Sequence, residues 1–160
     1  VEGKTAALFR WALAAGAAAG GLEGEARLAL ERYGKHLGVA FQLVDDRLDY
    51  GGDEALTGKL LFADLREGKL TYPLIVALER DPSVELPLRE LLSLDPLAPE
   101  AADPSRLLLA RIEALGGLEE CRLLALEQAE RAVEALSILP QGPARAALET
   151  VALSTVHRQR

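Results

Sequence analysis

Four polar residues that could bind a cation lie close together in the sequence: Gln42, Asp45, Asp46 and Asp49. At about 100° per residue of an α-helix, these four side chains fall within an arc of roughly 100° on one side. The opposite side is apolar and consists of Leu37, Ala40, Phe41, Val44 and Leu48. The pattern predicts a helix with one side in the core and three carboxylates and an amide along the other.

The three aspartates carry unfavourable interactions that a bound cation would offset. They lie in the last turns before Gly51, where the helix dipole is negative and disfavours each carboxylate by about 0.3–1 kcal/mol. Asp45 and Asp49 are also a like-charge pair four residues apart, which costs about 0.2–0.5 kcal/mol more. Because oxygen ligands suit a hard ion, we expect Asp45, Asp46 and Asp49 to bind Mg²⁺. The alternative is a solvated acidic helix face without a ligand.

The lysines fit the phosphate group that usually accompanies protein-bound Mg²⁺. Each of the four follows a glycine, in the pairs Gly3-Lys4, Gly34-Lys35, Gly58-Lys59 and Gly68-Lys69. Lys4 and Thr5 begin a predicted helix, where free backbone N–H groups favour an anion. Lys59 and Lys69 follow the aspartates in a loop. We therefore expect these three lysines to contact phosphate, and we interpret Lys35 as an ordinary surface residue.

The composition favours an all-α protein. The chain has 160 residues, of which 49% are hydrophobic and 4% aromatic, and Leu and Ala dominate the apolar set. These residues favour helices over strands. The net charge of −7 argues against nucleic-acid partners and anionic membranes. The longest uncharged run, residues 11–22, is too short to span a bilayer.

A single cysteine, Cys121, cannot form an internal disulfide, so we expect a reducing, cytoplasmic location and an inert packing role for this thiol. Glycines and prolines divide the chain into helices with no internal repeat or domain boundary, which predicts one domain over residues 1–160. Residues 53–66 are predicted to form a loop with at most short helical pieces. Helices are predicted over residues 4–19, 23–50, 73–80, 84–94, 105–115, 118–139 and 143–156.

Four motifs, in this order, resemble the C-terminal half of a trans-isoprenyl diphosphate synthase, and most closely the longer-chain bacterial polyprenyl synthases. The motifs are Lys4-Thr5, Phe41-Gln42-x-x-Asp45-Asp46-x-x-Asp49, Gly58-Lys59 and Asp64-Leu65-Arg66-Glu67-Gly68-Lys69-x-Thr71-x-Pro73. The resemblance implies an all-helical isoprenoid synthase fold with two aspartate-rich motifs facing each other across a cavity. It also implies a homodimer.

The resemblance assigns roles to the residues of these motifs. Asp45, Asp46 and Asp49 match the second aspartate-rich motif, whose carboxylates bind the Mg²⁺ that holds the allylic diphosphate. Lys4, Lys59 and Lys69 match lysines that contact this diphosphate, with Thr5 and Gln42 beside them, and Phe41 lies near the reacting tails. Asp45, Asp46, Lys4 and Lys59 are the expected catalytic set. In this family the allylic diphosphate ionises and the double bond of isopentenyl diphosphate attacks the resulting cation.

The chain departs from the family pattern in what it lacks. The first aspartate-rich motif, the arginines that follow it and the basic site for isopentenyl diphosphate are missing, and 160 residues is about half of what the resemblance requires. The start at Val1 and the absence of Met also suggest a fragment, which we expect to be inactive alone. The alternative is a non-catalytic diphosphate-binding or scaffold subunit of a prenyl synthase complex. A terpene cyclase-like enzyme fits less well, because its usual second metal motif is not found.

Overall fold

The structure is a computed structural model that describes residues 5–51, 61–95 and 98–158. Within these ranges the chain is helical and contains no strand, which confirms the all-α prediction. The chain forms two compact units. The first consists of Val1–Val44 and Arg122–Arg160, and the second is the continuous segment Asp45–Cys121. None of the described helices is both long enough and apolar enough to cross a membrane.

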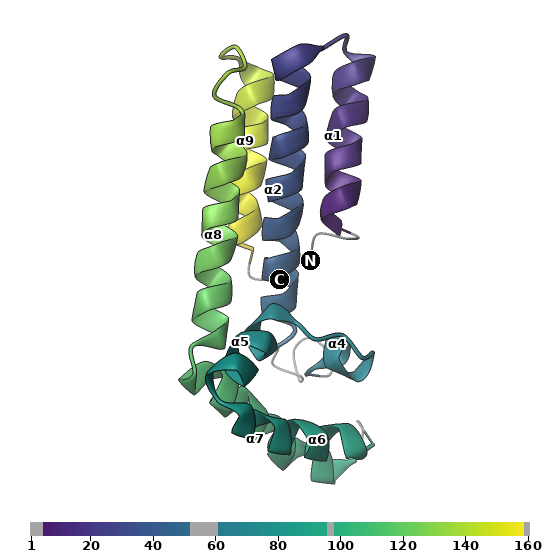
Figure 1. Cartoon of the computed structure of the whole chain (residues 1–160), viewed down its shortest axis with the longest axis vertical. Coiled ribbons are helices and arrows are strands. Elements are labelled where there is room, and N and C mark those ends of the chain that lie inside the picture. The colour runs from purple at the N-terminus through teal and green to yellow at the C-terminus, as the bar shows by residue number, and fades with distance from the viewer. Residues whose placement is uncertain (1–4, 52–60, 96–97, 159–160) are drawn as a thin grey trace. The chain divides into compact units, whose positions relative to one another are not determined.

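The first unit is a bundle of long helices that lie side by side (Figure 1). They are α1 (Ala7–Ala19), α2 (Gly24–Leu48) as far as Val44, α8 (Gly117–Ala135) from Arg122, and α9 (Pro143–Val156). The core includes Tyr33, whose hydroxyl donates a hydrogen bond to the carbonyl of Leu148 at 2.8 Å. Burial raises the pKa of this phenol to about 12. The rest of the core consists of Ala17, Leu30, Leu37, Ala132, Leu136 and Ala152.

Two glycines let α1 and α2 approach closely. A Cβ atom added at Gly34 would lie 2.8 Å from the carbonyl oxygen of Phe9, and one at Gly38 would lie 2.5 Å from the Cα of Ala6. Both distances are shorter than any normal contact, so no larger residue fits without moving a backbone. The Gly34-x-x-x-Gly38 spacing places both glycines on the side of α2 that meets α1.

The second unit is made of short elements separated by prolines. They are α4 (Ala63–Arg66), α5 (Tyr72–Arg80), the 3₁₀ turn η2 (Pro82–Val84), α6 (Glu85–Ser93), the 3₁₀ turn η3 (Pro99–Ala101) and α7 (Ala102–Ala114). Helices α5 and α6 both pack on α7. The buried core has large side chains, among them Tyr50, Phe62, Leu74, Leu88, Leu91, Leu108 and Ile112.

The predicted helices are confirmed, with differences at their ends. Helix α2 ends at Leu48 rather than Tyr50. Helix α7 begins at Ala102 rather than residue 105, because Pro104 is accommodated in the first turn, where its missing N–H leaves no hydrogen bond unmade. Helix α8 ends at Ala135 rather than residue 139, where the chain tightens into i→i+3 hydrogen bonds such as Leu136 N–H to the carbonyl of Val133.

Candidate diphosphate and metal site

The three predicted metal ligands lie at the end of α2 and directly after it. Asp45 and Asp46 belong to the last turn, and Asp49 is the first residue beyond the helix. Asp45 is half-buried, whereas only 5% of Asp46 and 4% of Asp49 is exposed. Because a solvated acidic face would leave all three carboxylates in water, that alternative does not describe Asp46 and Asp49.

Asp46 caps the start of α5. Its Oδ2 accepts a hydrogen bond of 3.2 Å from the backbone N–H of Tyr72, the first residue of that helix. Thr71 occupies the N-cap position, but its hydroxyl makes no capping hydrogen bond and pairs instead with the hydroxyl of Tyr50. A carboxylate at a helix N-terminus is stabilised by the free N–H groups and by the helix dipole. Asp46 therefore takes the capping role that Thr71 would otherwise have.

Asp49 is held by the segment that leads into the Gly68-Lys69 motif. Its Oδ2 accepts the backbone N–H of Asp64 at 3.2 Å, and its backbone carbonyl accepts the N–H of Phe62 at 3.3 Å. Phe62 has φ of 61°, a left-handed conformation that is rare for a bulky residue. Its ring is fully buried and meets the Tyr50 ring edge-on, with centroids 5.2 Å apart. A strained residue bonded to an aspartate indicates a place where geometry is functionally constrained.

Two buried titratable side chains of the second unit, Tyr50 and Cys121, are neutral. Burial, with a smaller effect from the charge of Asp46, raises the pKa of the Cys121 thiol to about 12. Burial also raises the pKa of Tyr50, and the charges of Asp49 and Asp46 add to that shift. Neither group exchanges a proton near neutral pH. Any proton transfer or metal binding at this end of α2 would therefore depend on the carboxylates, and Cys121 is buried as predicted.

Lys69 is exposed and ion-paired within its own loop. Its Nζ lies 2.8 Å from Oδ1 of Asp64 and 2.6 Å from Oε2 of Glu67. Hydrogen bonds to Asp64 and then to Glu67 are the main causes that raise its pKa, so the ammonium is charged at any physiological pH. To bind Lys69, a diphosphate would have to displace these two carboxylates from the ammonium group. The other two predicted phosphate ligands, Lys4 and Lys59, lie outside the described residues.

The first unit brings together two of the predicted substrate-binding residues. The hydroxyl of Thr5 donates a hydrogen bond of 2.7 Å to Oε1 of Gln42. This contact joins residues 37 positions apart and fixes the orientation of the amide, so that its NH₂ group keeps the donor role. The resemblance places Thr5 and Gln42 beside the diphosphate-contacting lysines, and the direct contact between these two side chains was not predicted.

Phe41, another predicted substrate-binding residue of this unit, is half-buried and lies near an aromatic ring and a cation. Its ring centroid lies 5.5 Å from that of Phe9. The guanidinium carbon of Arg158 lies 5.7 Å from the same centroid, within the range of a cation–π interaction. The ring is therefore contacted by two residues of its own unit.

No three His, Cys, Asp or Glu side chains of the described ranges are arranged as a ready metal site. The donors at the end of α2 nevertheless suit a hydrated Mg²⁺, which takes only one or two carboxylates from a protein and completes its shell with water and phosphate oxygens. Asp45 is the most accessible of the three carboxylates. The donor set thus fits a partly hydrated ion and does not form a complete protein cage.

Sequence reasoning missed three features of the second unit. Thr71 lies inside the Lys69-x-Thr71-x-Pro73 motif, so its position indicated a residue of the site. Its pairing with Tyr50 was not predictable from the sequence. The residue type does not predict the left-handed conformation of Phe62, because glycine is the usual residue in that conformation. Arg66 is a further case, since its Nε is buried with no hydrogen-bond partner among the described residues.

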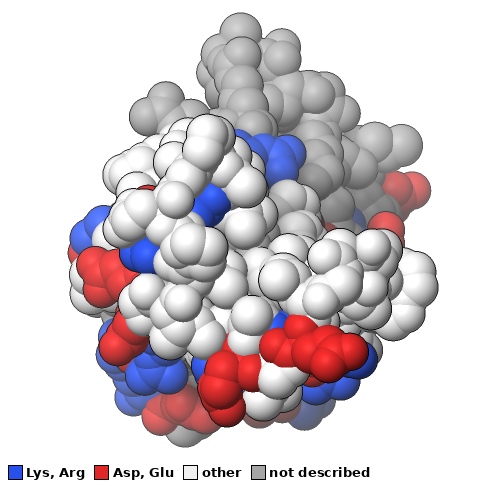
Figure 2. All heavy atoms as spheres, turned by 90° about the horizontal axis from the view of Figure 1, so that it is seen from above, with Lys and Arg blue, Asp and Glu red and all other residues white. Residues whose placement is uncertain are grey.

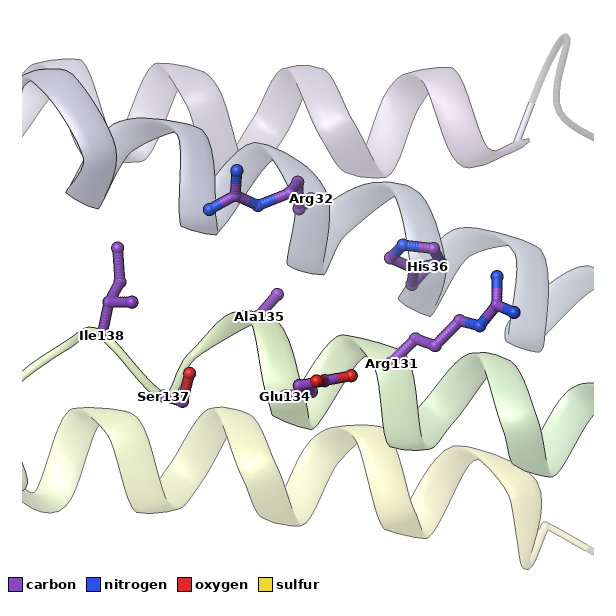
Figure 3. A pocket seen from close by; sticks show the side chains of 7 residues that line it. All are labelled: Arg32, His36, Arg131, Glu134, Ala135, Ser137 and Ile138. Atoms are coloured by element: carbon purple, nitrogen blue, oxygen red, sulfur yellow. The ribbon is translucent and has the colours of Figure 1, made fainter.

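A separate pocket of about 360 Å³ lies in the first unit between α2 and α8 (Figure 3). Its lining consists of Arg32, His36, Arg131, Glu134, Ala135, Ser137 and Ile138, none of which is a predicted site residue. Arg131 lies 2.6 Å from Glu127, and Arg32 lies 3.6 Å from Glu25. Because both guanidinium groups already face carboxylates, the pocket offers an anion no unshared charge from either of them.

Comparison with known proteins connects this arrangement to a family of enzymes. The chain is 37% identical over 163 residues to octaprenyl diphosphate synthase of Escherichia coli K12, an alignment that covers 100% of this chain and 49% of that protein. It is also 37% identical over 148 residues to the geranyl-diphosphate-specific all-trans-nonaprenyl-diphosphate synthase of Rhodobacter capsulatus, covering 92% of this chain and 44% of that one. The chain thus spans about half the length of these relatives.

A solved structure has the same fold. The polyprenyl synthase of Caulobacter crescentus CB15, crystallised with calcium and isoprenyl diphosphate, matches with a TM-score of 0.84 and 37% identity. The match covers 100% of this chain and 48% of that one. The polyprenyl synthetase family model matches residues 1–103, which include all the motifs described above. The chain therefore belongs to the polyprenyl synthetase family.

Proposed function

We propose that this chain is the C-terminal half of a trans-prenyl diphosphate synthase, which condenses an allylic diphosphate with isopentenyl diphosphate and releases diphosphate. The observation that carries the proposal is the family match over residues 1–103, because that segment contains every residue assigned to the site. The relatives named as octaprenyl and nonaprenyl diphosphate synthases support prenyl transfer as the reaction class.

The chemistry requires positive charge around the leaving group. Breaking the allylic C–O bond builds negative charge on the diphosphate, and cations fixed in advance lower this barrier in the way an oxyanion hole does. We assign this role to the ammonium groups of Lys4, Lys59 and Lys69. For Lys69 the assignment requires a switch of partner, from the carboxylates of Asp64 and Glu67 to phosphate oxygens.

We assign Asp45, Asp46 and Asp49 to Mg²⁺ binding, with Asp45 as the first ligand because it is the most accessible. A bound Mg²⁺ would neutralise charge on the diphosphate and help to orient it. Asp46 and Asp49 each accept a hydrogen bond from a backbone N–H at one carboxylate oxygen. These bonds restrict the two side chains in advance, which reduces the conformational entropy lost when a ligand binds.

Thr5, Gln42 and Phe41 complete the proposed substrate-binding set. The Thr5 hydroxyl orients the Gln42 amide, whose NH₂ group can then donate to a diphosphate oxygen. The Phe41 ring offers an apolar and polarisable surface for a prenyl chain. An apolar surrounding would also keep water from the carbocation formed on ionisation.

The experiment that tests this proposal compares the chain with a joined enzyme. In the joined enzyme, this chain replaces the aligned segment of the E. coli octaprenyl diphosphate synthase, which is 49% of that protein. With isopentenyl diphosphate, an allylic primer and Mg²⁺, the chain alone should give no condensation product and the joined enzyme should give one. Turnover by the purified 160-residue chain would overturn the claim that it holds only half of the site.

A further inference from the structure

Helix α1 is apolar on two opposite sides. Of its 13 residues, Arg10 is the only charged one, and eight of the others are alanine or glycine. A helix at the surface of a globular protein normally has one apolar and one polar side, whereas a helix that is apolar all round is buried on both. The composition of α1 is thus that of an interior helix.

One side of α1 is buried by α2. Ala17 is 2% exposed and Phe9 and Leu13 are half-buried against the core of the first unit. The close approach at Gly34 and Gly38 fixes the spacing of the two backbones. Arg10 is itself exposed, but at about 200° from Leu8 in the helical projection it lies away from the opposite side. The one charge of the helix therefore does not interrupt the opposite side.

The opposite side, which we term the outer face, consists of Leu8, Trp11, Ala12, Ala15 and Ala19. At about 100° per residue these five side chains fall within roughly 100° of each other. Trp11 is the only tryptophan of the chain, and 67% of it is exposed, as is 63% of Leu8. Seen from above, the molecule shows uncharged surface in the middle of the view, whereas charged side chains lie mainly along the left and lower edges, with a few at the upper centre and the right (Figure 2).

The comparisons indicate what should cover this face. The relatives are about twice as long as this chain, and the solved synthase matches all of it with 48% of its own length. We propose that the outer face of α1 packs against a helix from the half of the prenyl synthase fold that this chain does not span. The inference rests on the proposed function, in that it takes the chain as half of one such fold. Contiguous exposed apolar surface of this kind is typical of an interface.

Thiol labelling tests this packing, because the one natural thiol, Cys121, is buried. The Ala15→Cys variant places a thiol on the outer face, and Glu130→Cys places one at an exposed charged position of α8 in the same unit. Both variants are made in the chain alone and in the joined enzyme. The cysteines of the E. coli segment of the joined enzyme are replaced beforehand. Labelling by a maleimide measures accessibility and does not depend on turnover, so this inference and the proposed function can fail separately.

In the chain alone, both introduced thiols should react at similar rates. In the joined enzyme, the labelling rate of the Ala15→Cys thiol should fall by about 10-fold or more. The labelling rate of the Glu130→Cys thiol should be unchanged. Equal rates at both positions in a folded joined enzyme would overturn the proposal. If circular dichroism shows that the joined enzyme does not fold, cysteines at the aligned positions of the E. coli synthase itself decide, with the same two outcomes.

A second copy of this chain is the competing occupant. A second copy would protect the Ala15→Cys thiol of the chain alone from the maleimide. Sedimentation would also show a dimer of the chain alone, which Trp11→Glu would convert to a monomer. That pair of results would also overturn the proposal. Our expectation is that the outer face of the isolated chain stays open to the maleimide.

Discussion

The two units of this chain use different kinds of packing. In the first, long helices approach each other over small residues, with Gly34 and Gly38 of α2 in contact with the backbone of α1. In the second, short helices and 3₁₀ turns enclose large aliphatic and aromatic side chains around Leu108 and Phe62. The long helices leave few polar groups to satisfy inside the unit. The short elements have many free backbone N–H groups at their ends.

This difference explains where the aspartates are held. Asp46 accepts a hydrogen bond from the backbone N–H of Tyr72, at the start of α5. Asp49 accepts one from the backbone N–H of Asp64, in the first turn of α4. Such donors exist only because the second unit is broken into many short elements. The regular helix α2 thus determines where the aspartates lie, whereas the short segments of the second unit fix the orientation of their side chains.

The largest expected effect on stability comes from the core of the second unit. Leu108 is fully buried, so Leu108→Ala should lower the free energy of unfolding by about 2–5 kcal/mol through lost burial and a cavity. Urea denaturation measures this change. Leu86 is 72% exposed, and Leu86→Ala should change stability by less than about 0.5 kcal/mol. Equal effects of the two substitutions would refute the proposed core.

A single added methyl group tests the close packing of the first unit. In Gly38→Ala the new Cβ would lie 2.5 Å from the Cα of Ala6, so we expect a loss of about 1–3 kcal/mol from forced separation of α1 and α2. Gly16→Ala is the matched control, since no atom lies within 4 Å of its added Cβ. It should gain about 0.5–1 kcal/mol from helix propensity. Stabilisation by both substitutions would show that the helices do not touch there.

Loss of the Asp46 cap should have a smaller effect. Asp46→Ala removes the acceptor for the Tyr72 N–H, and we expect a loss of about 0.5–2 kcal/mol in urea denaturation without added Mg²⁺. Asp46→Asn keeps an oxygen at this position and should retain most of the stability. If Asp46→Ala were as stable as the parent chain, its capping role in the second unit would be wrong.

The smallest effect concerns the pH dependence of Asp81, the N-cap of η2. Hydrogen bonds from the side chain and backbone of Ser83, and then the charge of Arg111, lower the pKa of this carboxyl. Because the folded pKa lies below the unfolded value, the contribution is present above the unfolded pKa and is lost as pH falls through the folded one. Acid titration of stability should therefore be shallower in Asp81→Asn. Identical curves from the two proteins would exclude this contribution.

The sequence was sufficient to predict the long helices and the residues of the motifs, because helical periodicity and helix-breaking residues are local signals. The contact between Thr5 and Gln42 was not predicted, because the family resemblance placed both residues only beside the phosphate-binding lysines. The sequence did not predict the ends of α7 and α8, which depend on tertiary packing and on hydrogen bonds of the last turn. The left-handed Phe62 and the capping of α5 by Asp46 were also not predictable, since each depends on a contact between segments distant in the sequence.

The role of the α2 aspartates in prenyl transfer is tested most directly by Asp45→Ala in the joined enzyme. Steady-state turnover with isopentenyl diphosphate, an allylic primer and Mg²⁺ is compared with that of the parent joined enzyme and of Glu130→Ala, a control on α8. We predict that kcat falls about 100-fold or more in Asp45→Ala, as expected when a group that stabilises the transition state is removed. The Glu130→Ala control should retain full activity. Unchanged turnover in Asp45→Ala would contradict the assignment of this carboxylate to the metal and diphosphate site.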